Sequence, residues 1–118
     1  MADDPGGKPP LAPEDHPGRA LQQLMDMHGI DRRQLHQATG MDIMRVYKLL
    51  EGSRSVTADT ALRLGAFFEQ DPHYWLRLQA IYDLKQLDHR AVTDGIHRVS
   101  SNRWQSLPRT KHRAPRAK

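Results

Sequence analysis

The feature that most constrains this chain is a repeated alternation of glycines and helix-starting polar residues between residues 16 and 87. Glycine readily adopts the left-handed conformation that ends many helices, and Asp or Thr side chains accept hydrogen bonds from the first free N–H groups of the next helix. Such pairs occur at Gly29 with Asp31 and at Gly40 with Asp42. Strand signals are nearly absent, so the pattern predicts an all-α domain of five helices.

Capping residues and apolar spacing locate these helices. The predicted helix starts lie at Pro17, Asp31, Asp42, Thr57 and Asp71. Asp31 and Gln34 have the spacing of a capping box, in which each side chain accepts a hydrogen bond from the other residue's backbone N–H group. One side of the fourth helix is expected to carry Ala58, Ala61, Leu62, Gly65 and Phe68, and the fifth helix carries the apolar residues Tyr74, Trp75, Leu78, Ile81, Tyr82 and Leu84.

Two segments flank this domain. Residues 1–15 are rich in Pro, Gly and Asp, a composition that cannot bury enough surface to offset backbone entropy, and they are predicted to form a disordered arm. Residues 88–118 contain apolar residues without helical spacing and are predicted to form a basic, largely flexible tail. Within it, residues 92–99 are compatible with a short strand or a turn.

The net charge of +4 and the pI near 9.8 suggest nucleic-acid binding, but the charge is unevenly distributed. Residues 1–87 contain 10 Lys+Arg and 12 Asp+Glu, a net charge of −2, whereas residues 88–118 contain 8 and 2, a net charge of +6. The charge of the helical domain therefore does not indicate DNA binding. The tail could bind a nucleic-acid backbone, dock on a partner or increase solubility.

Several classes of protein are excluded by residue types that are absent. There is no cysteine, and the seven histidines have no metal-ligand spacing, so neither a metal nor another cofactor is expected. The sequence has neither paired carboxylates nor a phosphate-binding loop, so it does not indicate an enzyme. No run of 18 apolar residues predicts a membrane span, and residues 1–15 lack the pattern of a signal peptide, so we expect a cytoplasmic protein.

The most informative stretch is residues 32–51, in which a short helix, a tight turn through Gly40 and a second helix are predicted. This is the plan of a helix-turn-helix. Leu35, Val46 and Leu49 are the apolar residues expected to lock the two helices together. Locked in this way, the second helix projects from the domain and can enter the major groove of DNA, which is about 12 Å wide.

The sequence also resembles the HigA-type antitoxins, which are small XRE-like helix-turn-helix proteins of the lambda-repressor type. The resemblance rests on HPG at 16–18, TADTALRL at 57–64 and YWLRLQAIYDL at 74–84, and it covers residues 16–87. It implies a homodimeric repressor that binds double-stranded operator DNA in its own promoter. It also implies a partner toxin of the RelE/HigB type, a ribosome-dependent mRNA endonuclease.

The resemblance places base-facing residues in the first turns of the second helix, and arginines nearby are suited to phosphate contacts. The predicted DNA-binding residues are Arg32, Arg33, Ile43, Met44, Arg45, Tyr47, Lys48 and Arg54.

Some of these residues depart from the family's pattern. Ile43 and Met44 cannot hydrogen-bond to base edges, although either could contact a thymine methyl group. His36 and Thr39 stand where alanine and leucine are usual, so either the helix crossing is wider or the imidazole points to solvent. Two alternatives therefore stay open: a protein-interaction module that no longer reads an operator, and a regulator without a toxin.

The aromatic residues near the fifth helix allow two interpretations. Phe67, Phe68, Tyr74, Trp75 and Tyr82 could form core between the first, fourth and fifth helices, and part of the same surface could form a homodimer contact. Both interpretations can hold at once because a helix has two faces.

Overall fold

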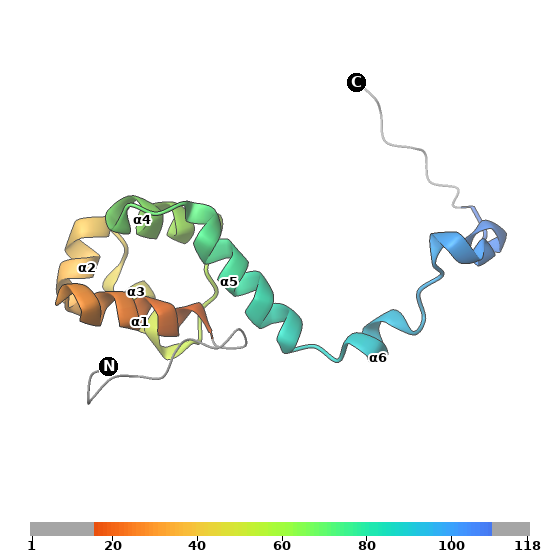
Figure 1. The fold of residues 1–118 in the computed structure, drawn as a ribbon, viewed down its shortest axis with the longest axis horizontal. Coiled ribbons are helices and arrows are strands. Elements are labelled where there is room, and N and C mark those ends of the chain that lie inside the picture. The colour runs from red at the N-terminus through yellow and green to blue at the C-terminus, as the bar shows by residue number, and fades with distance from the viewer. Residues whose placement is uncertain (1–15, 110–118) are drawn as a thin grey trace, which may run out of the picture. The chain divides into compact units, whose positions relative to one another are not determined.

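The computed structural model describes residues 16–109, and within them the chain forms helices and their connections. The all-α prediction is confirmed. Residues 16–87 and 88–109 belong to two separate units. The first unit contains α1 (Pro17–His28), α2 (Arg32–Thr39), α3 (Ile43–Glu51), α4 (Ala58–Phe68) and α5 (Pro72–Lys85), as Figure 1 shows. The predicted arm, residues 1–15, lies outside the described residues.

Capping groups end and start these helices as the sequence predicts. Gly29, Gly40 and Gly52 have φ values of 65°, 76° and 85°, in the left-handed region that favours glycine. The Asp31 side chain accepts from the Gln34 N–H group at 2.8 Å, and the Gln34 side chain accepts from the Asp31 N–H group at 2.9 Å. A capping side chain of this kind stabilises a helix by about 1 kcal/mol.

The start of α1 lies directly against the end of α3. His16 Nδ1 accepts a hydrogen bond from the Gly18 N–H group at 2.9 Å and thereby caps α1. A Cβ atom at Gly18 would lie 2.0 Å from the Leu49 carbonyl oxygen, so the two backbones touch. Packing therefore requires glycine at position 18, because any side chain there would push α1 away from α3.

The core of this unit is built by all five helices and the two loops that follow α2 and α3. Its buried apolar side chains are Ala20, Leu21, Met25, Leu35, Met41, Val46, Leu49, Val56, Ala61, Leu64 and Trp75. Trp75 is fully buried, and its Nε1–H group donates to Gln70 Oε1 at 3.0 Å. Trp75 therefore belongs to the core and is not part of a dimer contact.

Four of the apolar residues expected on the inner sides of α4 and α5 are exposed: Ala58, Leu62, Ile81 and Leu84. Leu62 is 61% exposed, and Leu64 is buried instead. The reason is Gly65, where a Cβ atom would lie 2.8 Å from the Gln70 carbonyl oxygen: this close approach brings the start of α5 against the side of α4 that carries Gly65 and Leu64. Ile81 and Leu84 are exposed because the second half of α5 extends beyond the other helices (Figure 1).

The second unit contains only short helices among its described residues: α6 (His89–Thr93), η1 (Val99–Ser101) and η2 (Arg103–Ser106). Residues 92–99 do not form the strand considered from the sequence. Asp88 caps α6 by accepting from the Ala91 N–H group at 3.2 Å, and a turn follows at residues 94–95. Residues 110–118 of the predicted tail lie outside the described residues. None of the described helices is long and apolar enough to cross a membrane.

Candidate nucleic-acid interface

The turn between α2 and α3 is held by side chains that the sequence marked as unusual. Thr39 Oγ1 donates to the Leu35 carbonyl oxygen at 2.7 Å and accepts from the Met41 N–H group at 3.2 Å. The His36 Nδ1–H group donates to the Met41 carbonyl oxygen at 2.6 Å. Together with the left-handed Gly40, these bonds fix the backbone of the turn, because they satisfy the polar groups that the end of α2 leaves free.

His36 does not point away to solvent. Its imidazole is half-buried at the junction of α2 and α3, where it bonds to the turn. It borders a shallow hollow between the two helices, whose other lining residues are Arg33, Gln37, Ile43 and Tyr47. The junction thus accommodates a ring where the family usually has a methyl group.

Helix α3 has one buried and one exposed side. Val46 and Leu49 face the core, whereas Met44, Tyr47 and Lys48 are exposed, Met44 to 50% and Tyr47 to 38%. The exposed side therefore presents a thioether, a phenol and an ammonium group. These groups can make an apolar contact with a thymine methyl group, hydrogen bonds to base edges and a contact to guanine or phosphate.

Arginines flank this exposed side. The Arg32 guanidinium lies 5.1 Å from the centre of the Tyr47 ring, a cation–π contact that joins the start of α2 to α3. Arg33 lines the hollow beside Ile43, and Arg54 is exposed in the loop after α3. Cations at these positions suit contacts to the DNA backbone on either side of α3.

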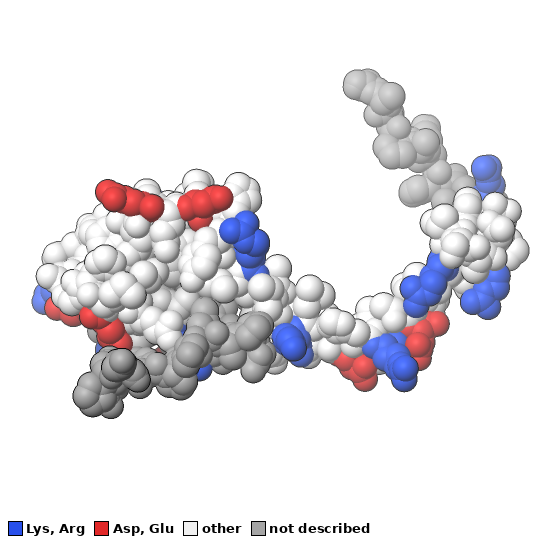
Figure 2. Space-filling view, in the orientation of Figure 1, with Lys and Arg blue, Asp and Glu red and all other residues white. Residues whose placement is uncertain are grey.

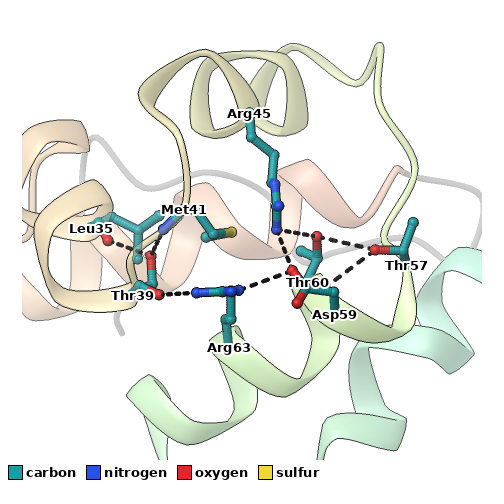
Figure 3. Close-up of polar contacts among 8 residues, drawn as sticks. All are labelled: Leu35, Thr39, Met41, Arg45, Thr57, Asp59, Thr60 and Arg63. Carbon is teal, nitrogen blue, oxygen red and sulfur yellow. Dashed lines mark hydrogen bonds and ion pairs between the residues drawn. The ribbon is translucent and has the colours of Figure 1, made fainter.

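Arg45 is the predicted site residue that the structure places elsewhere. Its Nη1–H group donates to Asp59 Oδ2 at 2.7 Å and to Thr60 Oγ1 at 3.3 Å, as Figure 3 shows. Its side chain is only 26% exposed. Arg45 therefore lies against α4, whereas Met44, Tyr47 and Lys48 remain on the exposed side of α3.

Asp59 also binds a second arginine. Arg63 Nε–H donates to Asp59 Oδ2 at 2.9 Å, and Arg63 Nη1–H donates to the Thr39 carbonyl oxygen at 2.8 Å. We call these five residues, Thr39, Arg45, Asp59, Thr60 and Arg63, the Asp59 cluster (Figure 3). Hydrogen bonds from Arg45 and then Arg63 hold the pKa of the Asp59 carboxyl below its usual value. The cluster connects α4 to both helices of the helix-turn-helix.

Sequence reasoning missed this cluster. The spacing of Asp59 and Arg63, four residues apart in a predicted helix, is a visible sign of an ion pair. Their partners Arg45 and Thr39 come from other helices, and no local pattern indicates them.

Acidic side chains are spread over the first unit. In the face that Figure 2 shows, they lie along the edge formed by α4 and also on the opposite side of this unit. Along the second unit, Arg90, Arg98, Arg103 and Arg109 accompany only two acidic residues, Asp88 and Asp94. Among residues 16–109 no three His, Asp or Glu side chains are grouped so that they could hold a metal ion.

Two helices are joined by a glycine turn, and the second has one exposed side and is braced by α4 through Arg45. This arrangement defines a helix-turn-helix domain. Virulence-associated protein I from Dichelobacter nodosus is 35% identical over 85 residues, which cover 71% of this chain and 78% of that protein. The structure of an addiction module antidote protein of the HigA family from Coxiella burnetii matches with a TM-score of 0.60 and 33% identity, covering 81% of this chain and 98% of that one. The chain belongs to the HigA family of antitoxins.

A third similarity is more distant. The Pseudomonas aeruginosa antitoxin HigA, solved with the higBA promoter, matches with a TM-score of 0.62 and 24% identity, covering 80% of this chain and 97% of that one. At this identity the similarity shows the fold alone. No family model matches the chain.

Proposed function

We propose that this protein is an operator-binding antitoxin that represses its own promoter. The observation that carries the proposal is the exposed side of α3, on which Met44, Tyr47 and Lys48 project, with the Arg32 guanidinium 5.1 Å from the centre of the Tyr47 ring. The promoter-bound antitoxin from P. aeruginosa supports it, because that protein has the same fold. Repression follows from steric exclusion of polymerase, and the site of action is the cytoplasm.

The proposal includes a homodimer. Helix-turn-helix readers bind two half-sites about 34 Å apart, which requires two copies of α3 in a fixed relation. Ile81, Leu84 and Leu87 at the end of the first unit are 38%, 55% and 56% exposed, an apolar row suited to a second copy of this chain. We assign the dimer contact to this row in place of the buried Trp75.

The proposal also includes a RelE/HigB-like toxin as the second partner, because the relatives are antitoxins and addiction module antidotes. Coexpression with the product of a small adjacent gene, followed by purification through a tag on the antitoxin, tests this part. Recovery of the antitoxin alone would contradict it and would favour a regulator without a toxin.

Operator binding is tested by measuring the affinity for a duplex from upstream of the protein's own gene and for a scrambled duplex of equal length. We expect Lys48→Ala to weaken promoter binding about tenfold, the loss of one good base or phosphate contact. Arg77→Ala, which removes an exposed positive charge from the middle of α5, outside the proposed dimer contact, is the control and is expected to bind like wild type. Equal wild-type affinity for both duplexes would contradict the proposal and favour a protein-interaction module.

A further inference from the structure

The Asp59 cluster contains two arginines whose positions are set by one carboxylate. Both Arg45 Nη1 and Arg63 Nε donate to the same atom, Asp59 Oδ2, at 2.7 and 2.9 Å. Arg45 belongs to α3 and Arg63 to α4, so the carboxylate holds cations from two helices at the start of α4 (Figure 3).

We propose that Asp59 limits the sequence-independent affinity for DNA by holding Arg45 and Arg63 against α4 and away from the DNA backbone. The inference rests on the proposed operator binding. It assigns to Asp59 a positioning role, since the carboxylate acts through the two arginines and not by touching a base.

The ion pair between Asp59 and Arg63 contributes little to stability. The Asp59 side chain is 54% exposed and that of Arg63 is 40% exposed, and ion pairs at this degree of exposure contribute little to folding. What the carboxylate does fix is where the guanidinium groups lie. With Asp59 in place, Arg45 bonds to α4 and Arg63 bonds to the end of α2 through the Thr39 carbonyl oxygen.

The consequence for DNA recognition follows from the two kinds of contact. Phosphate contacts raise the affinity for every duplex alike, whereas contacts to base edges distinguish one sequence from another. Arg45 adjoins Met44 in the sequence and lies on the helix proposed to enter the groove. Freed from Asp59, its long side chain can reach phosphates, and the loss of one negative charge strengthens the attraction to any DNA.

The test compares Asp59→Asn with wild type in the full chain, on the promoter duplex and on a scrambled duplex, over a range of salt concentrations. For each additional phosphate that the variant binds, we expect affinity for the scrambled duplex to rise about eightfold at ~0.1 M salt, and the salt dependence to steepen by about 0.9 in its log–log slope. Affinity for the promoter duplex is expected to rise by the same factor, because the added contact is available on every duplex. Glu69→Gln, which removes one exposed negative charge at the other end of α4, is the matched control and is expected to keep the wild-type salt slope.

A second pair of variants isolates Arg45. Arg45→Gln alone is expected to leave promoter affinity within about twofold of wild type, because the side chain already bonds within the protein. The double variant with Asp59→Asn is expected to bind the scrambled duplex less tightly than Asp59→Asn alone. The difference between the two affinities is the part of the gain that comes from Arg45. A merely structural role for Asp59 would give neither result.

The outcomes are distinct. A wild type that prefers the promoter, together with an Asp59→Asn variant that binds the scrambled duplex no more tightly and with the same salt slope, overturns this inference alone. A parallel loss of affinity for both duplexes with a lower melting temperature assigns Asp59 a purely structural role and also overturns it. A wild type that binds both duplexes equally overturns the proposed function, and this inference with it.

Discussion

The two tryptophans of the chain show how differently its two units are built. Trp75 in the first unit is fully buried and bonds to Gln70, whereas Trp104 in the second unit is 43% exposed and bonds to the Val99 carbonyl oxygen at 3.2 Å. Every buried residue among the described ones lies in the first unit. The second unit holds apolar residues without enclosing them.

The packed core and the excess of positive charge therefore lie in different parts of the chain. The net charge of +6 belongs to residues 88–118, whose described part has no core, while the helix-turn-helix lies in residues 1–87, which carry a net charge of −2. Composition alone would place DNA binding in residues 88–118, whereas the helix-turn-helix lies in the first unit. In the first unit, the cations proposed to contact DNA lie at the start of α2, on α3 and in the loop after α3.

Removing each tryptophan in turn gives the largest expected contrast. Trp75→Ala should lower the free energy of unfolding by about 3–5 kcal/mol, because it leaves a large cavity in the core. Trp104→Ala should change it by less than about 0.5 kcal/mol. Denaturant unfolding followed by circular dichroism measures both, and similar losses from the two variants would show that the second unit also has a packed core.

Two glycines allow a finer comparison. Gly18→Ala should cost about 1–3 kcal/mol, since the new Cβ atom would lie 2.0 Å from the Leu49 carbonyl oxygen and must force α1 from α3. Gly95→Ala in the second unit meets no atom within 4 Å and should be neutral or slightly stabilising. Thermal denaturation distinguishes them, and a neutral Gly18→Ala would refute the backbone contact between α1 and α3.

The smallest expected effect is a pH dependence confined to the first unit. Burial lowers the pKa of His16 below 6.5, against opposing contributions from the Arg54 backbone and Asp83, and the neutral Nδ1 accepts from the Gly18 N–H group. The unfolded chain therefore binds the proton more readily. The stabilisation is complete above about pH 6.5 and decreases as the pH falls below that value.

Melting temperatures at about pH 7.5 and about pH 5.5, on either side of the ordinary histidine pKa, measure this dependence. His16→Asn, which keeps a capping side chain without a group that titrates, should reduce the difference between the two pH values. His97→Asn in the second unit serves as the control and should behave like wild type. An unchanged difference in His16→Asn would exclude His16 as its source.

Local signals in the sequence were enough to predict the class of fold. The capping box of Asp31 and Gln34 and the glycines at positions 29, 40 and 52 act within a few residues, so their effect is visible without a structure. The inward face of α4 was predicted less well. Leu62 has the right residue type for the core, but Gly65 decides which side of α4 the start of α5 contacts.

The candidate site likewise has some features that the sequence predicts and others that only the structure shows. The resemblance to the antitoxin family implies Met44, Tyr47 and Lys48 as site residues, and the structure places them on the exposed side of α3. Arg45 was predicted beside them because a sequence shows its neighbours and not Asp59, which lies fourteen residues further along the chain. Gln79 was missed for the same reason: it is buried, and its side chain accepts from the Val56 N–H group at 2.7 Å.

The close approach of Gly18 to Leu49 has a consequence for how such a protein can acquire a new binding sequence. The orientation of α3 is set from behind, by the backbone of α1 and by the Asp59 cluster. The exposed residues Met44 and Lys48 take no part in that support through their side chains. Their identities can therefore drift or be exchanged while the helix keeps its angle, which makes the domain a scaffold on which target choice and folding evolve separately.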